Sequence, residues 1–82
     1  MIENGTIVEL SNNKKYILTD SVIENNHIYY LALEVDYKTE IPNENSMFFE
    51  LKNNNILTPI TDINDIDFLK IVFVNKFIEN TN

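Results

Sequence analysis

The chain has 82 residues and a formal net charge of −7, with 13 acidic residues against 6 lysines and no arginine. It contains no cysteine, which excludes a disulfide scaffold, a thiolate metal site and a cysteine nucleophile. Phosphate contacts require basic residues, so this composition disfavours direct binding to nucleic acid. A protein partner is expected instead, and a basic one fits the charge better than an anionic one.

The apolar content predicts a folded chain outside the membrane. Hydrophobic residues make up 44% of the sequence and include four Tyr and five Phe, enough for the core of one domain over residues 1–82. No apolar run approaches the roughly 20 residues that span a bilayer. The start "MIENGTIVEL" lacks the basic and apolar blocks of a secretory signal, so the cytoplasm is the expected location.

Asparagine clusters mark the expected turns. They occur at residues 12–13, 25–26 and 53–55, each between runs with strand character, in a chain that has a single glycine. Tight hairpin turns need positive φ, and asparagine tolerates this conformation better than other residues with a side chain. The clusters therefore predict hairpin turns.

The runs between these turns predict strands. The run "HIYYLALEV" is apolar on both faces, so its strand should be central in the sheet. Pro59 lacks an N–H group and belongs on an edge or at a strand end. The predicted strands cover residues 6–10, 15–23, 27–35, 46–52 and 55–60.

The longest predicted loop, residues 36–45, lies between the third and fourth strands. It is polar and contains a proline, so it is the segment expected to be most mobile. Its carboxylates, Asp36, Glu40 and Glu44, are possible interaction residues.

Helical spacing begins after Thr61, and a helix is predicted over residues 62–78. Thr61 or Asp62 can cap its first turn. The stripe expected to face the sheet consists of Ile63, Ile66, Phe73 and Phe77, flanked by Leu69 and Val74. The fold class is therefore α+β, a twisted antiparallel meander of about five strands packed against one C-terminal helix.

Phe68 and Val72 do not fit this stripe, because they fall on the opposite side of the helix. One interpretation is that residues 70–74, "KIVFV", form a strand. In the other, the two side chains are exposed or contact a partner, which makes them possible interaction residues and allows a homodimer through the helix.

Motifs for catalysis or metal binding are weak. His27 is the only histidine and has no evident nucleophile or second ligand in the sequence. The run "TDINDID" lacks the glycine and glutamate of a calcium loop, and helix capping explains its acids. Neither catalytic residues nor a metal or cofactor is expected, and the protein is not expected to be an enzyme.

Three segments carry a family resemblance: "GTIVEL", "KYILTDSVIENNHIYYLAL" and "MFFELKNNNILTPITDINDIDFLKIVFVNKF". In their order and hydrophobic spacing they resemble the small acidic DUF1292-type proteins of Firmicutes. Pro59-Ile60-Thr61-Asp62 and the segment 68–77 correspond to the end of that pattern, although this chain has fewer acids and more asparagine. The resemblance implies a fold and no activity.

The expected function is that of a small, acidic, non-catalytic protein-binding module. One alternative is an anti-defence inhibitor from a phage or mobile element, which would mimic nucleic-acid charge and block a basic groove. The other is a regulatory homodimer assembled through the C-terminal helix.

Overall fold

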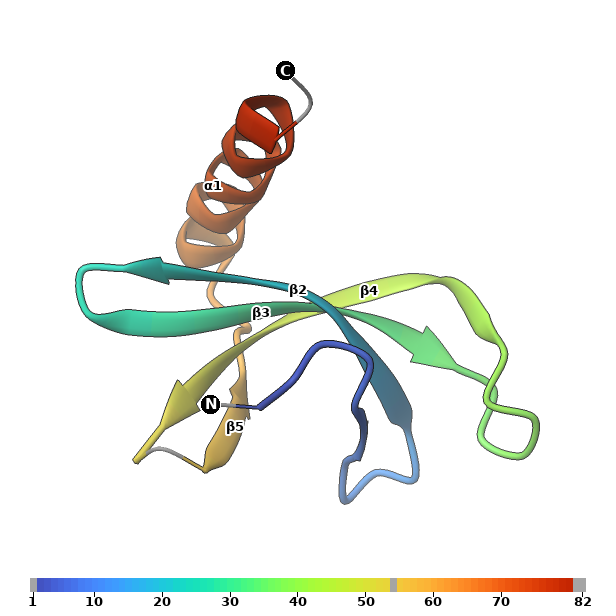
Figure 1. The fold of residues 1–82 in the computed structure, drawn as a ribbon. Helices are drawn as coiled ribbons and strands as arrows, with labels where there is room; N and C mark the ends of the chain where they lie inside the picture. Colours follow the sequence, from blue (N-terminus) through green and yellow to red (C-terminus); the bar gives the residue numbers. More distant parts are fainter. Residues whose placement is uncertain (1, 54, 81–82) are drawn as a thin grey trace.

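The computed structural model describes residues 2–53 and 55–80, which form one antiparallel sheet and a C-terminal helix (Figure 1). The sheet order β1-β2-β3-β4-β5 follows the chain, so β3 is central as predicted. The α+β class and the five-stranded meander are confirmed. The elements are β1 (Ile7–Glu9), β2 (Lys15–Glu24), β3 (His27–Val35), β4 (Pro42–Lys52), β5 (Ile56–Pro59) and α1 (Ile63–Asn80).

Asparagines with positive φ make the turns. Asn25 and Asn26, which join β2 to β3, have φ of 51° and 66°, the pair of left-handed residues that a type I′ turn requires. Asn13 lies between β1 and β2 at φ 63°, and Asn53 follows β4 at φ 51°. The turn prediction is confirmed at these residues, while Asn54 lies outside the described residues.

The inner face of the curled sheet holds one core. Tyr30 is fully buried there, and its hydroxyl donates to the Ile2 carbonyl (2.6 Å) and accepts from the Ile2 N–H (2.9 Å). An irregularity at Thr19 interrupts the β2–β3 register; such bulges increase the local twist and bend the strand. The buried members of this core are Tyr16, Leu18, Tyr30, Ala32, Phe49 and Leu51.

The helix covers the other face of the sheet. Leu69 and Phe73 are buried against Phe48, and the rings of Phe48 and Phe73 stack at a centroid distance of 5.4 Å. Asp62 caps α1, since its Oδ1 accepts the N–H of Asn64 at 2.8 Å. Partly buried side chains around this second core are Val22, Tyr29, Leu31, Ile60 and Ile66.

The predicted start of β4 is wrong, and the predicted helical stripe is right only for Ile66, Leu69 and Phe73. β4 begins at Pro42 instead of Ser46, so the preceding loop is shorter than expected. On α1, Ile63, Val74 and Phe77 are exposed, and Leu69 is the most buried residue. Apolar residues occupy most sides of this helix, so their spacing could not select the side that meets the sheet.

The segment 70–74 lies inside α1, so the alternative prediction of a strand there is wrong. Pro59 is the last residue of β5, an edge strand of the sheet, as predicted.

Truncation of Leu69 should destabilise the protein much more than truncation of Phe77. Leu69 is 1% exposed and Phe77 is 70% exposed. Leu69→Ala should lower the free energy of unfolding by about 2–5 kcal/mol, whereas Phe77→Ala should change it by less than about 0.5 kcal/mol. Urea denaturation in dilute solution measures both values. Equal losses would contradict the observed orientation of the helix.

Replacing Asn26 should separate backbone strain from side-chain contacts. Asn26→Val places a β-branched residue in the left-handed region and should cost about 1–2 kcal/mol. Asn26→Gly should leave stability unchanged or raise it, because glycine adopts this φ without strain. Thermal unfolding measures the difference, with Ser46→Val at an exposed position of β4 as the control. Equal stabilities of the Val and Gly variants would refute the role of φ in this turn.

Candidate interaction surface

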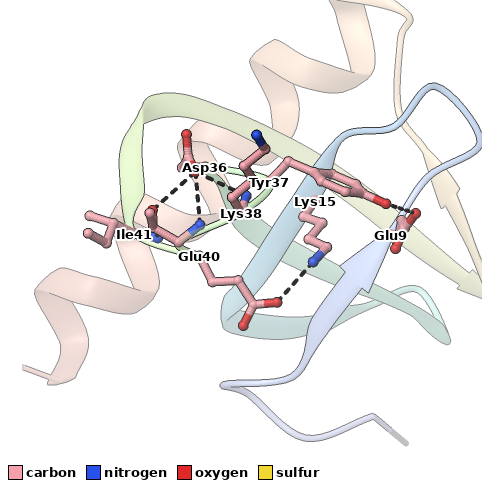
Figure 2. A network of polar contacts seen from close by, with 8 residues as sticks. Glu9, Lys15, Asp36, Tyr37, Lys38, Glu40 and Ile41 are labelled. Carbon is pink, nitrogen blue, oxygen red and sulfur yellow. Dashed lines mark hydrogen bonds and ion pairs between the residues drawn. The ribbon is translucent and has the colours of Figure 1, made fainter.

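Asp36 organises the loop between β3 and β4 (Figure 2). Its carboxylate accepts hydrogen bonds from the Thr39 N–H (2.9 Å), the Lys38 N–H (3.0 Å) and the Thr39 hydroxyl (3.1 Å). These donors favour the charged form, so the Thr39 and Lys38 N–H groups, followed by the Thr39 hydroxyl, hold the pKa of Asp36 below its ordinary value. The Asp36 carboxylate is therefore engaged within its own loop.

The same loop is fastened to β1 and β2 (Figure 2). Lys15 Nζ lies 3.1 Å from Glu40 Oε2 and 4.5 Å from the centroid of the Tyr37 ring. The Tyr37 hydroxyl donates to Glu9 at 2.7 Å. Glu40 raises the pKa of Lys15, and Glu9 raises that of Tyr37. The segment expected to be most mobile is thus anchored by polar contacts at its exposed surface.

The three acidic candidates from this region do not form one site. Asp36 and Glu40 make the contacts described above, whereas Glu44 is an exposed residue of β4. The pattern of acids in the sequence could not distinguish carboxylates that build a loop from one that faces solvent.

A larger apolar surface lies on α1. We name as the outer face of α1 those large apolar side chains of the helix that are 46–70% exposed: Ile63, Phe68, Ile71, Val74, Phe77 and Ile78. Phe68 belongs to it, as the sequence suggested, but Val72 does not, because Val72 is half-buried beside β2. The sequence prediction missed most of this face because it assigned Ile63, Val74 and Phe77 to the core.

The part of the outer face in residues 68–78 also differs from the rest of the chain in charge. Thirteen of the 82 residues are acidic, yet none lies in the segment 68–78, which contains Lys70 and Lys76. The nearest carboxylates along the chain are those of Asp67 and Glu79. The segment 68–78 is therefore apolar, with Lys70 exposed and Lys76 paired with Asp20 of β2, in a protein that is otherwise strongly acidic.

A pocket of about 430 Å³ lies between α1 and β2. β1 pairs only with residues 15–17 of β2, so the later part of β2 has no strand on that side in the described residues. Both main-chain groups of Ser21 form hydrogen bonds with side chains here. The Ser21 N–H donates to the Asp20 carboxylate (2.8 Å), and the Ser21 carbonyl accepts from Lys76. Lys76 also pairs with Asp20 at 2.7 Å. The pocket is lined by Ser21, Val22, Ile23, Glu24, Val72, Lys76 and Glu79.

These contacts protect an open strand edge. Unpaired main-chain groups on an edge strand invite pairing with another chain, and lysine is a common means of preventing it. The Asp20–Lys76 pair occupies the main-chain groups of Ser21 at this edge. We therefore do not regard the pocket as the binding site of a partner strand.

His27 contacts Glu50 at the surface. The His27 Nδ1 to Glu50 Oε2 distance is 2.7 Å, and the histidine side chain is 55% exposed. Burial raises the pKa of the neighbouring Tyr29, with a smaller contribution from Glu50.

Asp62, from the run considered for calcium, caps α1, and no group of three or more potential metal-ligating side chains occurs among residues 2–53 and 55–80.

Among the described elements, no helix has both the length and the apolar character needed to cross a bilayer. Comparison of this chain with protein-family models, with curated proteins and with solved structures finds no match. The resemblance to DUF1292-type proteins therefore stays a prediction.

Asp36 should contribute to the pH dependence of stability. Its pKa is lower in the folded protein than in the unfolded chain, so its contribution is present above the ordinary carboxyl pKa and is lost as pH falls through the folded value. Asp36→Asn should therefore destabilise the protein near neutral pH, and its difference from the wild type should shrink in acid. Urea denaturation at about pH 6 and about pH 2.5 measures this.

Glu44→Gln removes the same charge from an exposed residue of β4 and controls for net charge. A difference between wild type and Asp36→Asn that stays constant from neutral to acidic pH would contradict this role of the Asp36 carboxylate.

Proposed function

We propose that this protein is a non-catalytic protein-binding module and that it contacts its partner through the outer face of α1. The observation that carries the proposal is the concentration of exposed apolar side chains on one helix. Ile71, Val74 and Phe77 lie within two turns, and each is more than half exposed. Contiguous apolar surface on a soluble domain marks an interaction site more often than scattered single residues do.

The unfavourable effect of exposed apolar side chains on solubility supports the same proposal. A chain of this size has a small core and marginal stability. Polar residues at positions 71, 74 and 77 would leave the packing of Leu69 and Phe73 on the sheet intact and would improve solubility. Binding to another protein is a direct reason for apolar residues at these positions.

The polar groups favour a non-catalytic role. Three groups with shifted pKa values surround the exposed loop between β3 and β4: Asp36 and Tyr37 lie in the loop, and Lys15 of β2 contacts it. A catalytic centre more often shows such shifts in a cleft, on groups aimed at a substrate. The exposed pair of His27 and Glu50 offers no such arrangement.

The structure gives less support to a nucleic-acid mimic. Several carboxylates contact groups of the protein itself: Glu9, Asp20, Asp36, Glu40 and Glu50. The most apolar exposed face carries no carboxylate in its central segment. We therefore favour an apolar contact over charge-driven blocking of a basic groove. The basic partner and the cytoplasmic location stay predictions from composition.

Site-specific photo-crosslinking tests the proposed function. A photoreactive residue replaces Val74 in one variant and Lys38, in the exposed loop, in another, and each is expressed in the native host. We expect a discrete adduct from position 74, lost when Ile71→Asp is added, and no such adduct from position 38. Salt should weaken the contact little, because apolar burial is screened less than ion pairing.

The absence of any adduct at position 74, or an adduct that survives Ile71→Asp, would overturn the proposed function. Steep loss of the adduct with added salt would favour the charge-mimic alternative instead.

A further inference from the structure

We propose that the partner of the outer face of α1 is a second copy of this chain, and that two α1 helices pair antiparallel about Val74. The inference rests on the proposed function and names the partner. It follows from the spacing of the exposed side chains, from the distribution of charge and from the area that the face can bury.

The spacing makes this face self-complementary. Ile71 and Phe77 lie three residues before and after Val74, and all three side chains are exposed. Three residues advance roughly 300° around an α-helix, so these side chains stay within one side of α1. A two-fold axis at Val74 brings Val74 against the Val74 of the second copy and sets Ile71 at the height of the other Phe77. Such self-matching is the requirement of a two-fold interface.

The charge distribution favours self-association through this face over self-association through other surfaces of the chain. Two chains of net charge −7 repel each other, but the segment 68–78 contains no carboxylate. Two copies therefore meet where their repulsion is weakest. Lys70, which is exposed on α1, further reduces the local negative potential. In the two-fold contact this carboxylate-free face meets the same face of the second copy, so most of the acidic residues of each chain stay outside the contact.

The charges also favour the antiparallel orientation. In a parallel pair, Lys70 would lie beside Lys70 of the other copy, and the helix dipoles would be aligned. In the antiparallel pair, Lys70 lies over the ring of the other copy's Phe77, where a cation–π contact is possible. The two dipoles are then opposed. The lysine becomes part of the contact in this arrangement instead of a source of repulsion.

The available area predicts a weak, reversible dimer. A fully buried large apolar side chain removes roughly 60–120 Å² of apolar surface from water. With three or four such residues from each copy, the total burial is roughly 400–1,000 Å², below the approximately 1,200 Å² of standard stable interfaces. Interfaces of this size are typical of weak, transient complexes, so we expect association at concentrations on the order of 100 μM, which corresponds to a binding free energy of about −5.5 kcal/mol.

Sedimentation equilibrium from about 10 μM to about 500 μM tests the association. The average mass of the wild type should rise from near one chain toward two. Val74→Asp should remain monomeric throughout while keeping the helical circular dichroism signal and unfolding transition of the wild type. The matched control Ile41→Asp, at a residue 64% exposed in the loop before β4, should associate like the wild type. A wild type that stays monomeric at the highest concentration would overturn the inference.

Disulfide crosslinking tests the geometry, because the natural chain has no cysteine and each variant carries a single thiol. In the antiparallel pair, Val74→Cys should crosslink to itself, and a mixture of Lys70→Cys and Phe77→Cys should form the mixed dimer. Phe77→Cys alone should crosslink poorly, because its two copies would lie about 9 Å apart along the helix axis, beyond disulfide reach. Efficient crosslinking of Phe77→Cys alone would indicate a parallel pair and overturn the antiparallel one.

These results separate the two proposals. If position 74 yields an adduct with a different protein in cells while the purified wild type stays monomeric, the proposed binding function stands and the second copy is wrong. If neither an adduct nor a dimer forms, both proposals fail.

Discussion

The sheet has two apolar faces, and the described chain has one helix to cover them. β3 shows the problem directly, because Tyr30 and Ala32 point to one core while Tyr29 and Leu31 point to the other. Curling of the sheet buries the first set on its inner face, and α1 covers the second set. The irregularity at Thr19 and the tight hairpin at Asn25 and Asn26 permit this curl. Every other feature of the fold depends on this division.

The same division explains why α1 carries exposed apolar side chains. The sheet offers the helix a limited apolar area around Phe48, and Leu69 and Phe73 fill it. Apolar residues elsewhere on the helix have no further sheet surface to cover, and the last turns of α1 extend away from the strands toward the C-terminus (Figure 1). The outer face is thus a consequence of packing a helix that is apolar on most sides against a small apolar area of the sheet. In the proposed function, these exposed side chains bind the partner.

Some of the acidic residues stabilise the fold as well as keeping the chain charged in solution. Asp36 holds its loop through hydrogen bonds to main-chain N–H groups, and Asp62 caps α1 in the same way. Asp20, with Lys76, guards the open edge of β2. In each case a carboxylate satisfies a main-chain group directly or positions a lysine that does so. The net charge is therefore an incomplete guide to the electrostatics of any one surface.

The sequence by itself determined the features that depend on local chemistry. Asparagine at turn positions, the two-sided apolar pattern of β3 and the acidic cap before the helix are properties of short segments, and each led to the correct element. Only the tertiary structure decided which side of α1 is buried, because the helix has apolar residues around most of its circumference. The partner surface on the sheet selected Leu69 and left Phe77 in solvent. The same holds for Asp36 and Glu40, whose partners in the folded chain, including Lys15 on β2, are set by the path of the chain in space.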